Sequence, residues 1–234
     1  MNSKLVYKVV LPKNSKAEKH PTILFLHGRG ADENDLLGLS EYFDESFPKG
    51  MASPLYISVR APFRFEYGGF TWYDILEAGK PDDKMFPESC NALSDFFDEM
   101  SKGLLAEIKE FPIDEKKIFL LGFSMGTVMA YSLALTRPNE IAGVIANSGY
   151  IAEGTHLNYE WEKISNDNSP SFFVTHGLYD PVLPVSFGRR AKQLLEQYNA
   201  KLEYKEYPME HQISEESLGD VANWLKKQML FREA

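Results

Sequence analysis

The sequence is poor in cysteine, in basic residues and in uninterrupted apolar runs. Its 234 residues include one cysteine, Cys90, so no disulfide can form within the chain. Acidic residues outnumber Lys and Arg by 34 to 25, and the resulting net charge of −9 disfavours nucleic acid as a partner. No apolar run approaches the roughly 20 residues of a membrane-spanning helix, so we expect no membrane span.

The sequence also offers little for binding a metal ion or for directing export. The five histidines are scattered, and there is neither an H-E-x-x-H motif nor a cysteine cluster, so we expect no metal site. The first seven residues lack the apolar core of a signal peptide, which together with the cysteine count predicts a cytoplasmic protein. The hydrophobic content of 44% is typical of globular proteins, and the length suits one α/β domain over residues 1–234.

Segments typical of strands alternate with segments of helical periodicity along most of the chain. The predicted strands cover residues 5–11, 22–26, 55–59, 117–121, 143–146, 172–175 and 202–207. The predicted helices cover residues 35–47, 92–111 and 185–198, and a last helix begins after Ser214 as its N-cap. This alternation predicts a mostly parallel central sheet with helices on both faces. Residues 61–91 and 150–170 are irregular, and we expect Met85 and Phe86 to belong to a flap, with residues 75–90 as a possible lid.

Gly122-Phe123-Ser124-Met125-Gly126 is the most informative motif in the chain. It follows the apolar run at residues 118–121 and precedes a segment of apolar and small residues, so the predicted order is strand, sharp turn, helix. G-x-S-x-G in this context is the nucleophile elbow of an α/β-hydrolase. Glycine tolerates the close backbone approach of such a turn, and the helix N-terminus favours negative charge that develops beside the serine.

A serine nucleophile needs a base to accept its proton and a carboxylate to orient that base. In this fold the chain order is serine, acid, histidine, and both partners follow late strands. Asp180 follows the strand at residues 172–175 and His211 follows the strand at 202–207, which puts both at the same sheet edge as Ser124. We therefore predict a catalytic triad of Ser124, Asp180 and His211.

Other acids and histidines fit these roles less well. Asp167 lies in a polar loop away from a strand end, and Asp220 lies inside the last predicted helix. Asp180 could also be a turn residue or helix cap before Pro181. His27 and His176 each precede a glycine at a strand end, where hydrogen bonding of the loop is the simpler interpretation.

The negative charge of an acyl-transfer intermediate needs two backbone N–H donors. We predict that Met125, which follows the nucleophile, supplies one, and that Arg29 in the loop at residues 27–32 supplies the other. The Arg29 side chain could contact an anionic substrate or pair with a nearby carboxylate.

In the order in which they occur, several motifs resemble the phospholipase/carboxylesterase family, which includes acyl-protein thioesterases and lysophospholipases. They are H-G-R-G-A-D-E at residues 27–33, A-P at 61–62, G-G-F-T-W-Y-D at 68–74, the elbow at 122–126 and H-G-L-Y-D-P-V-L-P at 176–184. The resemblance implies a cofactor-free esterase or thioesterase with a small-molecule ester or thioester substrate. It also implies triad roles for Ser124, Asp180 and His211 and oxyanion donors at Arg29 and Met125. Many relatives have Gln where this chain has Met125, and Gly where it has Glu210.

Substrate preference is less constrained by the sequence. Phe70, Trp72 and Tyr73 could form part of an acyl or alcohol wall, or could be core aromatics. Carboxylesterase activity is the favoured function, with lysophospholipase or acyl-protein thioesterase as alternatives. A peptidase or lyase on the same scaffold, a non-catalytic ligand-binding protein and a homodimer also stay open.

Overall fold

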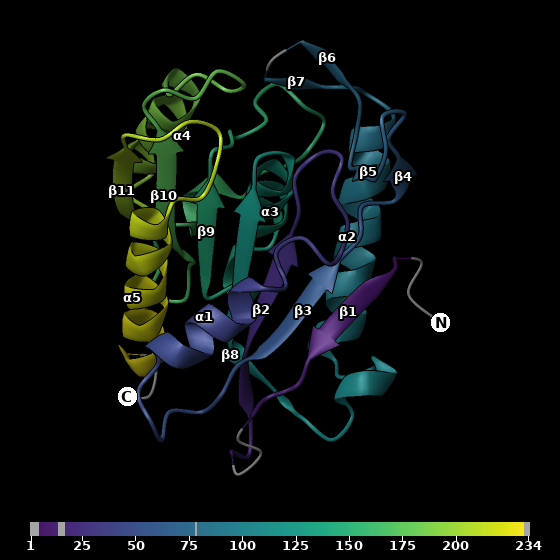
Figure 1. The fold of residues 1–234 in the computed structure, drawn as a ribbon. Helices are drawn as coiled ribbons and strands as arrows, with labels where there is room; N and C mark the ends of the chain where they lie inside the picture. The colour runs from purple at the N-terminus through teal and green to yellow at the C-terminus, as the bar shows by residue number, and fades with distance from the viewer. Residues whose placement is uncertain (1–4, 14–16, 78, 232–234) are drawn as a thin grey trace.

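A seven-stranded sheet forms the framework of the computed structural model, which describes residues 5–13, 17–77 and 79–231 (Figure 1). The strands lie side by side in the order β1-β3-β2-β8-β9-β10-β11. Only β1 runs antiparallel, against β3, and the other neighbouring strands of this sheet pair in parallel. Their bounds are β1 Tyr7–Val10, β2 His20–Leu26, β3 Leu55–Val59, β8 Ile113–Phe123, β9 Gly143–Asn147, β10 Ser171–Gly177 and β11 Lys201–Tyr207.

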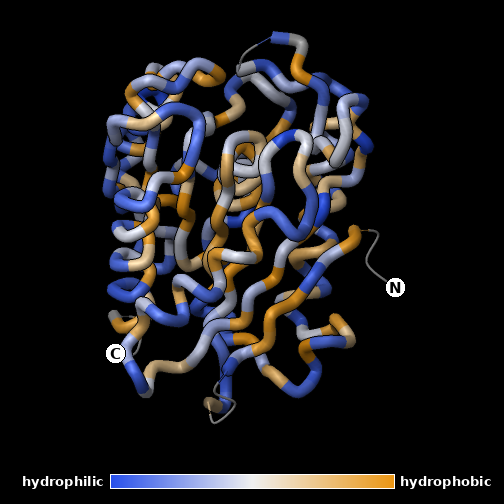
Figure 2. Tube along the Cα trace, in the orientation of Figure 1, coloured by the Kyte–Doolittle hydropathy of each residue, from blue (hydrophilic) through white to orange (hydrophobic). Residues whose placement is uncertain are grey.

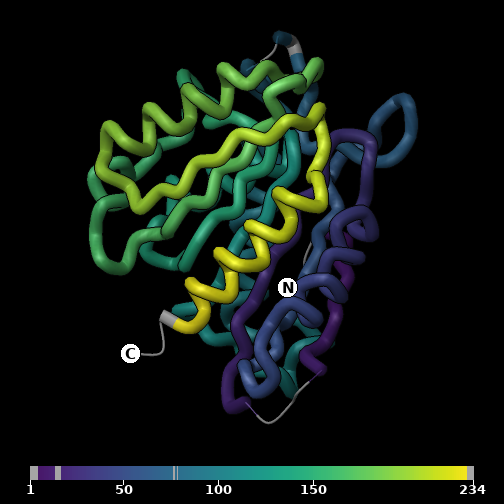
Figure 3. The backbone as a smooth tube through the Cα atoms, turned by 60° about the vertical axis from the view of Figure 1, so that its left-hand side comes forward, coloured from purple at the N-terminus to yellow at the C-terminus, as the bar shows by residue number. Residues whose placement is uncertain are grey.

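Helices cover both faces of this sheet. One face carries α1 (Leu39–Ser46) and α5 (Glu215–Phe231), which lie next to each other in Figure 3. The other face carries α2 (Met85–Ser101), α3 (Met125–Thr136) and α4 (Ser186–Gln197). Figure 2 shows hydrophobic and hydrophilic residues alternating along α5, as expected for a helix with one buried face.

The sheet separates two hydrophobic cores because successive side chains of a strand point to opposite faces. In β2, Leu24 and Leu26 belong to the core beneath α2, α3 and α4. Ile23 and Phe25 belong to the core beneath α1 and α5. All four side chains are fully buried, which explains why this strand is an unbroken apolar run in the sequence.

The predicted architecture is confirmed, and each of the seven predicted strands is present: β3 has its predicted bounds, and the others differ by one to four residues at one or both ends. The last helix begins as predicted, with the Ser217 N–H donating to Ser214 Oγ at 3.2 Å. The helix predicted over residues 35–47 is shorter, since α1 begins at Leu39.

The prediction for residues 75–111 is wrong in two respects. The helix starts at Met85 rather than residue 92, because Asp82 Oδ1 accepts the N–H groups of Lys84 at 2.9 Å and Met85 at 2.7 Å. It ends at Ser101, two residues before Gly103 adopts a φ of +65°. Met85 and Phe86 therefore belong to α2 instead of a flap, and Phe86 is 1% exposed.

Two small hairpins precede α2 at the carboxyl edge of the large sheet. The first pairs β4 (Phe63–Arg64) with β5 (Phe70–Thr71), and the second pairs β6 (Ile75–Glu77) with β7 (Lys80–Pro81). Short 3-10 helices lie at Ala106–Ile108, Pro138–Glu140 and Trp161–Lys163. Figure 1 shows both hairpins at the end of the molecule toward which the parallel strands point.

The glycine after the serine in the G-x-S-x-G motif is required by contact between backbones. A Cβ added at Gly126 would lie 1.9 Å from the Leu26 carbonyl oxygen. Because this oxygen belongs to the backbone of β2, no change of side-chain rotamer could remove the clash. This glycine therefore allows α3 to begin directly against the end of β2.

We expect Gly126→Ala to lower the free energy of unfolding by about 3 kcal/mol, because the added methyl group overpacks two backbone segments. Gly219 in α5 provides the matched control, since its added Cβ would meet only the Tyr42 hydroxyl at 3.5 Å. Gly219→Ala should raise stability by about 0.5–1 kcal/mol through helix propensity. Urea unfolding of both variants measures the difference, and equal midpoints would contradict the steric account.

Candidate active site

Ser124 lies at the sharp turn between β8 and α3. Its backbone has φ 53° and ψ −118°, a conformation that residues other than glycine rarely adopt. The turn is held by a hydrogen bond from the Ser124 N–H to the Asn147 carbonyl oxygen at 2.9 Å. The side chain thereby sits at the carboxyl end of the central strand and beside the N-terminus of α3.

The structure brings Ser124, His211 and Asp180 into one hydrogen-bonded chain. His211 Nε2 lies 2.8 Å from Ser124 Oγ, and His211 Nδ1 lies 2.7 Å from Asp180 Oδ2. An ionised carboxylate only accepts, so the proton of neutral His211 is on Nδ1 and the lone pair of Nε2 faces the serine hydroxyl. This is the tautomer that a base acting on Ser124 requires.

Asp180 is held from the side opposite His211. Its Oδ1 accepts the N–H groups of Val182 at 2.9 Å and Leu183 at 2.8 Å. The Asp180 side chain is fully buried, so His211 can meet its carboxylate without competition from bulk water. The Glu210 side chain, in contrast, is exposed.

Two further aromatic rings, those of Phe123 and His176, lie against His211 and Asp180. Phe123 packs against His211, with ring centroids 5.0 Å apart. His176 is fully buried below the Asp180 loop, where its Nε2 donates to the Leu183 carbonyl oxygen at 2.7 Å and lies 3.5 Å from Asp180 Oδ2. Burial lowers the pKa of His176, which keeps this ring neutral beside the carboxylate.

The loop after β2 approaches Ser124 from the other side. His27 fixes its first residues, with Nδ1 donating to the Gly28 carbonyl at 2.7 Å and Nε2 accepting the Ala61 N–H at 3.0 Å. A Cβ added at Gly28 would lie 3.5 Å from Ser124 Cβ, so this loop borders the serine directly. Within the described part of the chain, the N–H groups of Arg29 and Met125 donate no hydrogen bond.

The Arg29 side chain does not pair with a carboxylate among the described residues. Its guanidinium lies 4.3 Å above the ring of Phe65, in the first hairpin. Arg60 instead forms the ion pair of this loop, with two contacts of 2.5 and 2.7 Å to the Glu33 carboxylate. Because the Glu33 side chain is only 4% exposed, this pair ties the loop to the end of β3.

The three aromatic residues predicted near the substrate lie in different environments. Phe70 is half-buried, with the guanidinium of Arg60 4.5 Å above its ring. Trp72 and Tyr73 are 0% and 1% exposed and belong to the core. The Trp72 indole donates to the His27 carbonyl at 3.0 Å, and the Tyr73 hydroxyl lies 3.1 Å from that of Tyr150. Of the three, Phe70 alone therefore has a partly exposed side chain.

The sequence reasoning missed three residues that contact the site. Phe123 stands in a variable position of the G-x-S-x-G motif, which carries no signal for its packing on His211. The Thr71 hydroxyl lies 3.3 Å from the sulfur of Met125. Asn147 ends an otherwise apolar strand, a signal that could have marked it as a buried polar residue with a specific partner.

The Cys90 thiol is poorly suited to act as a nucleophile. Burial raises the pKa of the Cys90 thiol to about 12, so it is not a thiolate at neutral pH.

Over residues 5–13, 17–77 and 79–231, no group of three or more His, Cys, Asp or Glu side chains could hold a metal ion. Across the same ranges, no helix has the length and apolar character needed to cross a membrane.

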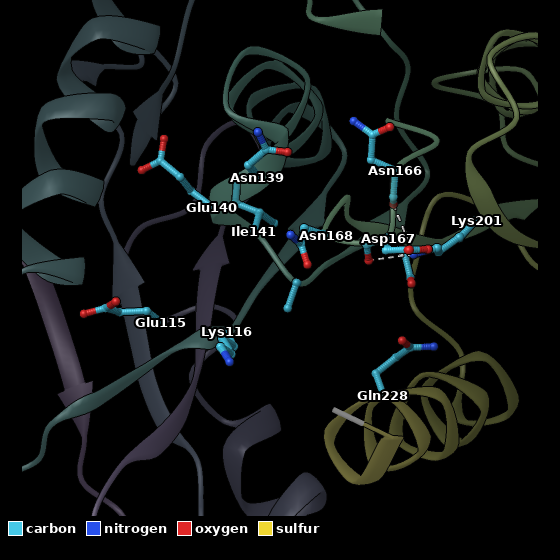
Figure 4. Close-up of a pocket in the computed structure, with 12 residues that line it drawn as sticks. Glu115, Lys116, Asn139, Glu140, Ile141, Asn166, Asp167, Asn168, Lys201 and Gln228 are labelled. Atoms are coloured by element: carbon cyan, nitrogen blue, oxygen red, sulfur yellow. Dashed lines mark hydrogen bonds between the residues drawn. The ribbon is translucent and has the colours of Figure 1, made fainter. Parts of the chain in front are cut away.

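A broad polar depression lies at the opposite edge of the sheet (Figure 4). Its volume is about 920 Å³, and it is bordered by the amino ends of β10 and β11, with Ser171 and Lys201. The Lys201 ammonium already donates to the carbonyl oxygens of Asn166 at 3.2 Å and Asp167 at 2.9 Å. None of the residues hydrogen-bonded to Ser124 or His211 borders this depression.

The sequence and the fold are both similar to those of known esterases and thioesterases. The family model described as Phospholipase/Carboxylesterase matches residues 7–229. Acyl-protein thioesterase 1 of Saccharomyces cerevisiae is 30% identical, over 89% of this chain and 92% of that protein. Its counterpart in Candida albicans is 27% identical, over 94% and 97%. The crystal structure of the Bacillus cereus carboxylesterase has the same fold, with a TM-score of 0.76, 24% identity and coverage of 97% and 96%.

Two of the buried histidines, His27 and His176, predict a loss of stability in mild acid. Burial lowers the pKa of both His27 and His176, so each binds a proton more readily in the unfolded chain. Their contribution is complete above the unfolded pKa of about 6.5 and is lost as the pH falls, by at most about 2 kcal/mol each down to pH 5. Urea midpoints at pH 7 and pH 5 measure this loss. His176→Gln should reduce the difference between the two midpoints, whereas His156→Gln, at an exposed position, should preserve it.

Proposed function

The chain belongs to the phospholipase/carboxylesterase family, and from this we propose that it cleaves carboxylic esters or thioesters through an acyl-Ser124 intermediate. The observation that carries the proposal is the chain of hydrogen bonds from Ser124 Oγ to His211 and Asp180, at 2.8 and 2.7 Å. These are the contacts that convert a weakly nucleophilic hydroxyl into a reactive one.

In the proposed reaction, Ser124 Oγ attacks the carbonyl carbon while His211 Nε2 takes the hydroxyl proton. The buried Asp180 carboxylate stabilises the imidazolium that forms and keeps its Nδ1–H directed away from the serine. His211 then donates the proton to the leaving alcohol or thiol as the tetrahedral intermediate collapses. Water then attacks the acyl-serine with His211 again as the base, the bond from the acyl carbon to Ser124 Oγ breaks, and the carboxylic acid leaves as His211 returns the proton to Ser124.

The tetrahedral intermediate carries a negative charge on the former carbonyl oxygen. We assign its stabilisation to the N–H groups of Arg29 and Met125, which make no other hydrogen bond among the described residues. Met125 is the first residue of α3, so the helix N-terminus adds favourable electrostatic potential at the same place. Both donors belong to the backbone, which makes the reaction compatible with Met at position 125.

Two substrate classes fit this site. Carboxylic esters require nothing beyond the triad and the two donors. Acyl-protein thioesters are the second candidate, favoured by the relatives named acyl-protein thioesterase 1. Apolar surface beside Asp180 supports an acyl chain in either class, since Leu178, Tyr179 and Val182 are 40%, 66% and 60% exposed.

We expect Ser124→Ala to reduce kcat about 10⁴-fold or more, because the nucleophile is lost while binding and oxyanion contacts stay. The measurement is hydrolysis of p-nitrophenyl butyrate and of an S-acyl thioester by freshly purified protein. Ser165→Ala, at an exposed serine, is the matched control and should keep the wild-type rate. If Ser124→Ala retained activity on both substrates, Ser124 would not be the nucleophile.

We expect kcat/KM to increase with acyl chain length from butyryl to octanoyl, since each buried methylene contributes up to about 0.8 kcal/mol. Val182→Ser should lower the octanoyl to butyryl ratio and leave the butyryl rate within about twofold, because it removes apolar surface only. Matched oxygen esters and thioesters of each length separate the two substrate classes. A wild-type ratio below one would rule out long acyl substrates and leave short carboxylic esters.

A further inference from the structure

Asn147 is a buried amide directly behind the nucleophile turn. It is the last residue of β9, pairs in register with Phe123 of β8, and is 1% exposed. A primary amide in such a position loses its hydration on folding, which is unfavourable unless protein groups replace the water. The side-chain amide and the backbone carbonyl of Asn147 make four hydrogen bonds to two segments, the turn around Ser124 and the adjacent strand β10.

Three of these hydrogen bonds hold the turn on both sides of Ser124. Asn147 Nδ2 donates to the Gly122 carbonyl oxygen at 2.9 Å. The Asn147 carbonyl oxygen accepts the Ser124 N–H at 2.9 Å and the Thr127 hydroxyl at 2.7 Å. One residue thus fixes the strand before the serine, the serine itself and the first turn of the helix after it.

The fourth hydrogen bond orients the amide. Thr175 in β10 donates its hydroxyl to Asn147 Oδ1 at 2.8 Å. The Gly122 carbonyl can only accept, so it must face the NH₂ group, and the threonine hydroxyl completes the only arrangement that satisfies both ends. Thr175 is 1% exposed and leads into the loop that carries Asp180, so the network joins the strand of the nucleophile to the strand of its acid.

Resting on Ser124 as the proposed nucleophile, we infer that Asn147 and Thr175 are positioning residues for catalysis: their side-chain hydrogen bonds set the distance between Ser124 Oγ and His211 Nε2. Neither side chain contacts Ser124 Oγ or the His211 ring among the interactions of the described residues. They act through the backbone of residues 122–127, whose strained conformation at Ser124 depends on support from its surroundings. A displacement of about 1 Å at such a site can cost on the order of 100-fold in rate.

The test uses variants of nearly unchanged size. Thr175→Val removes the hydroxyl, Thr175→Ser retains it, and Asn147→Asp replaces the donor that faces the Gly122 carbonyl with a second acceptor. Thr22→Val is the matched control, because Thr22 is a fully buried threonine in β2 whose hydroxyl has no hydrogen-bond partner among the described residues. Each variant is titrated with a fluorophosphonate that labels an activated serine, and kcat is expressed per labelled site.

We expect Thr175→Val to lower kcat per site and the labelling rate about tenfold, and Asn147→Asp to lower both by about 100-fold. KM should stay within about threefold, Thr175→Ser should restore most of the rate, and Thr22→Val should match the wild type. A purely structural role predicts fewer labelled sites with a wild-type kcat at each one. That result in Thr175→Val would overturn the inference even if Asn147→Asp failed to fold.

The same experiment distinguishes failure of the inference from failure of the proposed function. If the wild type is labelled at Ser124 and the variants react at the wild-type rate per site, the positioning role is wrong and the nucleophile assignment stands. If the wild type is not labelled, or Ser124→Ala is labelled equally, both are wrong. Equal losses of kcat in Thr175→Val and Thr175→Ser would also overturn the inference, because the hydroxyl would then be irrelevant.

Discussion

The left-handed backbone of Ser124 is the constraint on which the rest of this site depends. A non-glycine residue in that region costs roughly 1–3 kcal/mol and persists only where its surroundings hold it. Here β8 anchors one side, α3 anchors the other, and the end of β2 packs so closely that an added Cβ at Gly126 would lie 1.9 Å from its last carbonyl oxygen. The core around these elements therefore maintains a serine whose side chain is held at the sheet edge, within 2.8 Å of His211 Nε2.

Parallel strands explain how residues far apart in the sequence meet. The carboxyl ends of parallel strands share one edge of the sheet, so each loop that follows a strand begins at the same surface. Ser124, Asp180 and His211 follow β8, β10 and β11, and the loop of Arg29 follows β2. The opposite edge holds a polar depression, but its Lys201 is already engaged by backbone carbonyls and no element brings the linked serine and histidine there.

Strong and local signals made most of the fold predictable from the sequence. Buried parallel strands are unbroken apolar runs, and the order of serine, acid and histidine after successive strands indicated which side chains would lie together. The start of α2 was missed because it depends on the Asp82 carboxylate, which precedes the helix and lies outside any helical repeat. Trp72 was ambiguous because an aromatic residue in a glycine-rich segment gives no indication of which way it points, and its burial depends on a distant carbonyl, that of His27. The role of Asn147 depends on pairing across strands, which a single sequence does not reveal.

The ion pair between Glu33 and Arg60 has a consequence for how the two halves of the site are supported. Ser124, His211 and Asp180 follow β8, β11 and β10, whereas the loop with Arg29 is tied by this pair and by Phe70 to β3 and the first hairpin. The two N–H groups proposed to stabilise the oxyanion therefore have different supports, because Met125 begins α3 directly after Ser124 and Arg29 lies in a loop held by the neighbouring strand. One proposed donor is built into the serine turn itself, and the other is positioned by a salt bridge outside it.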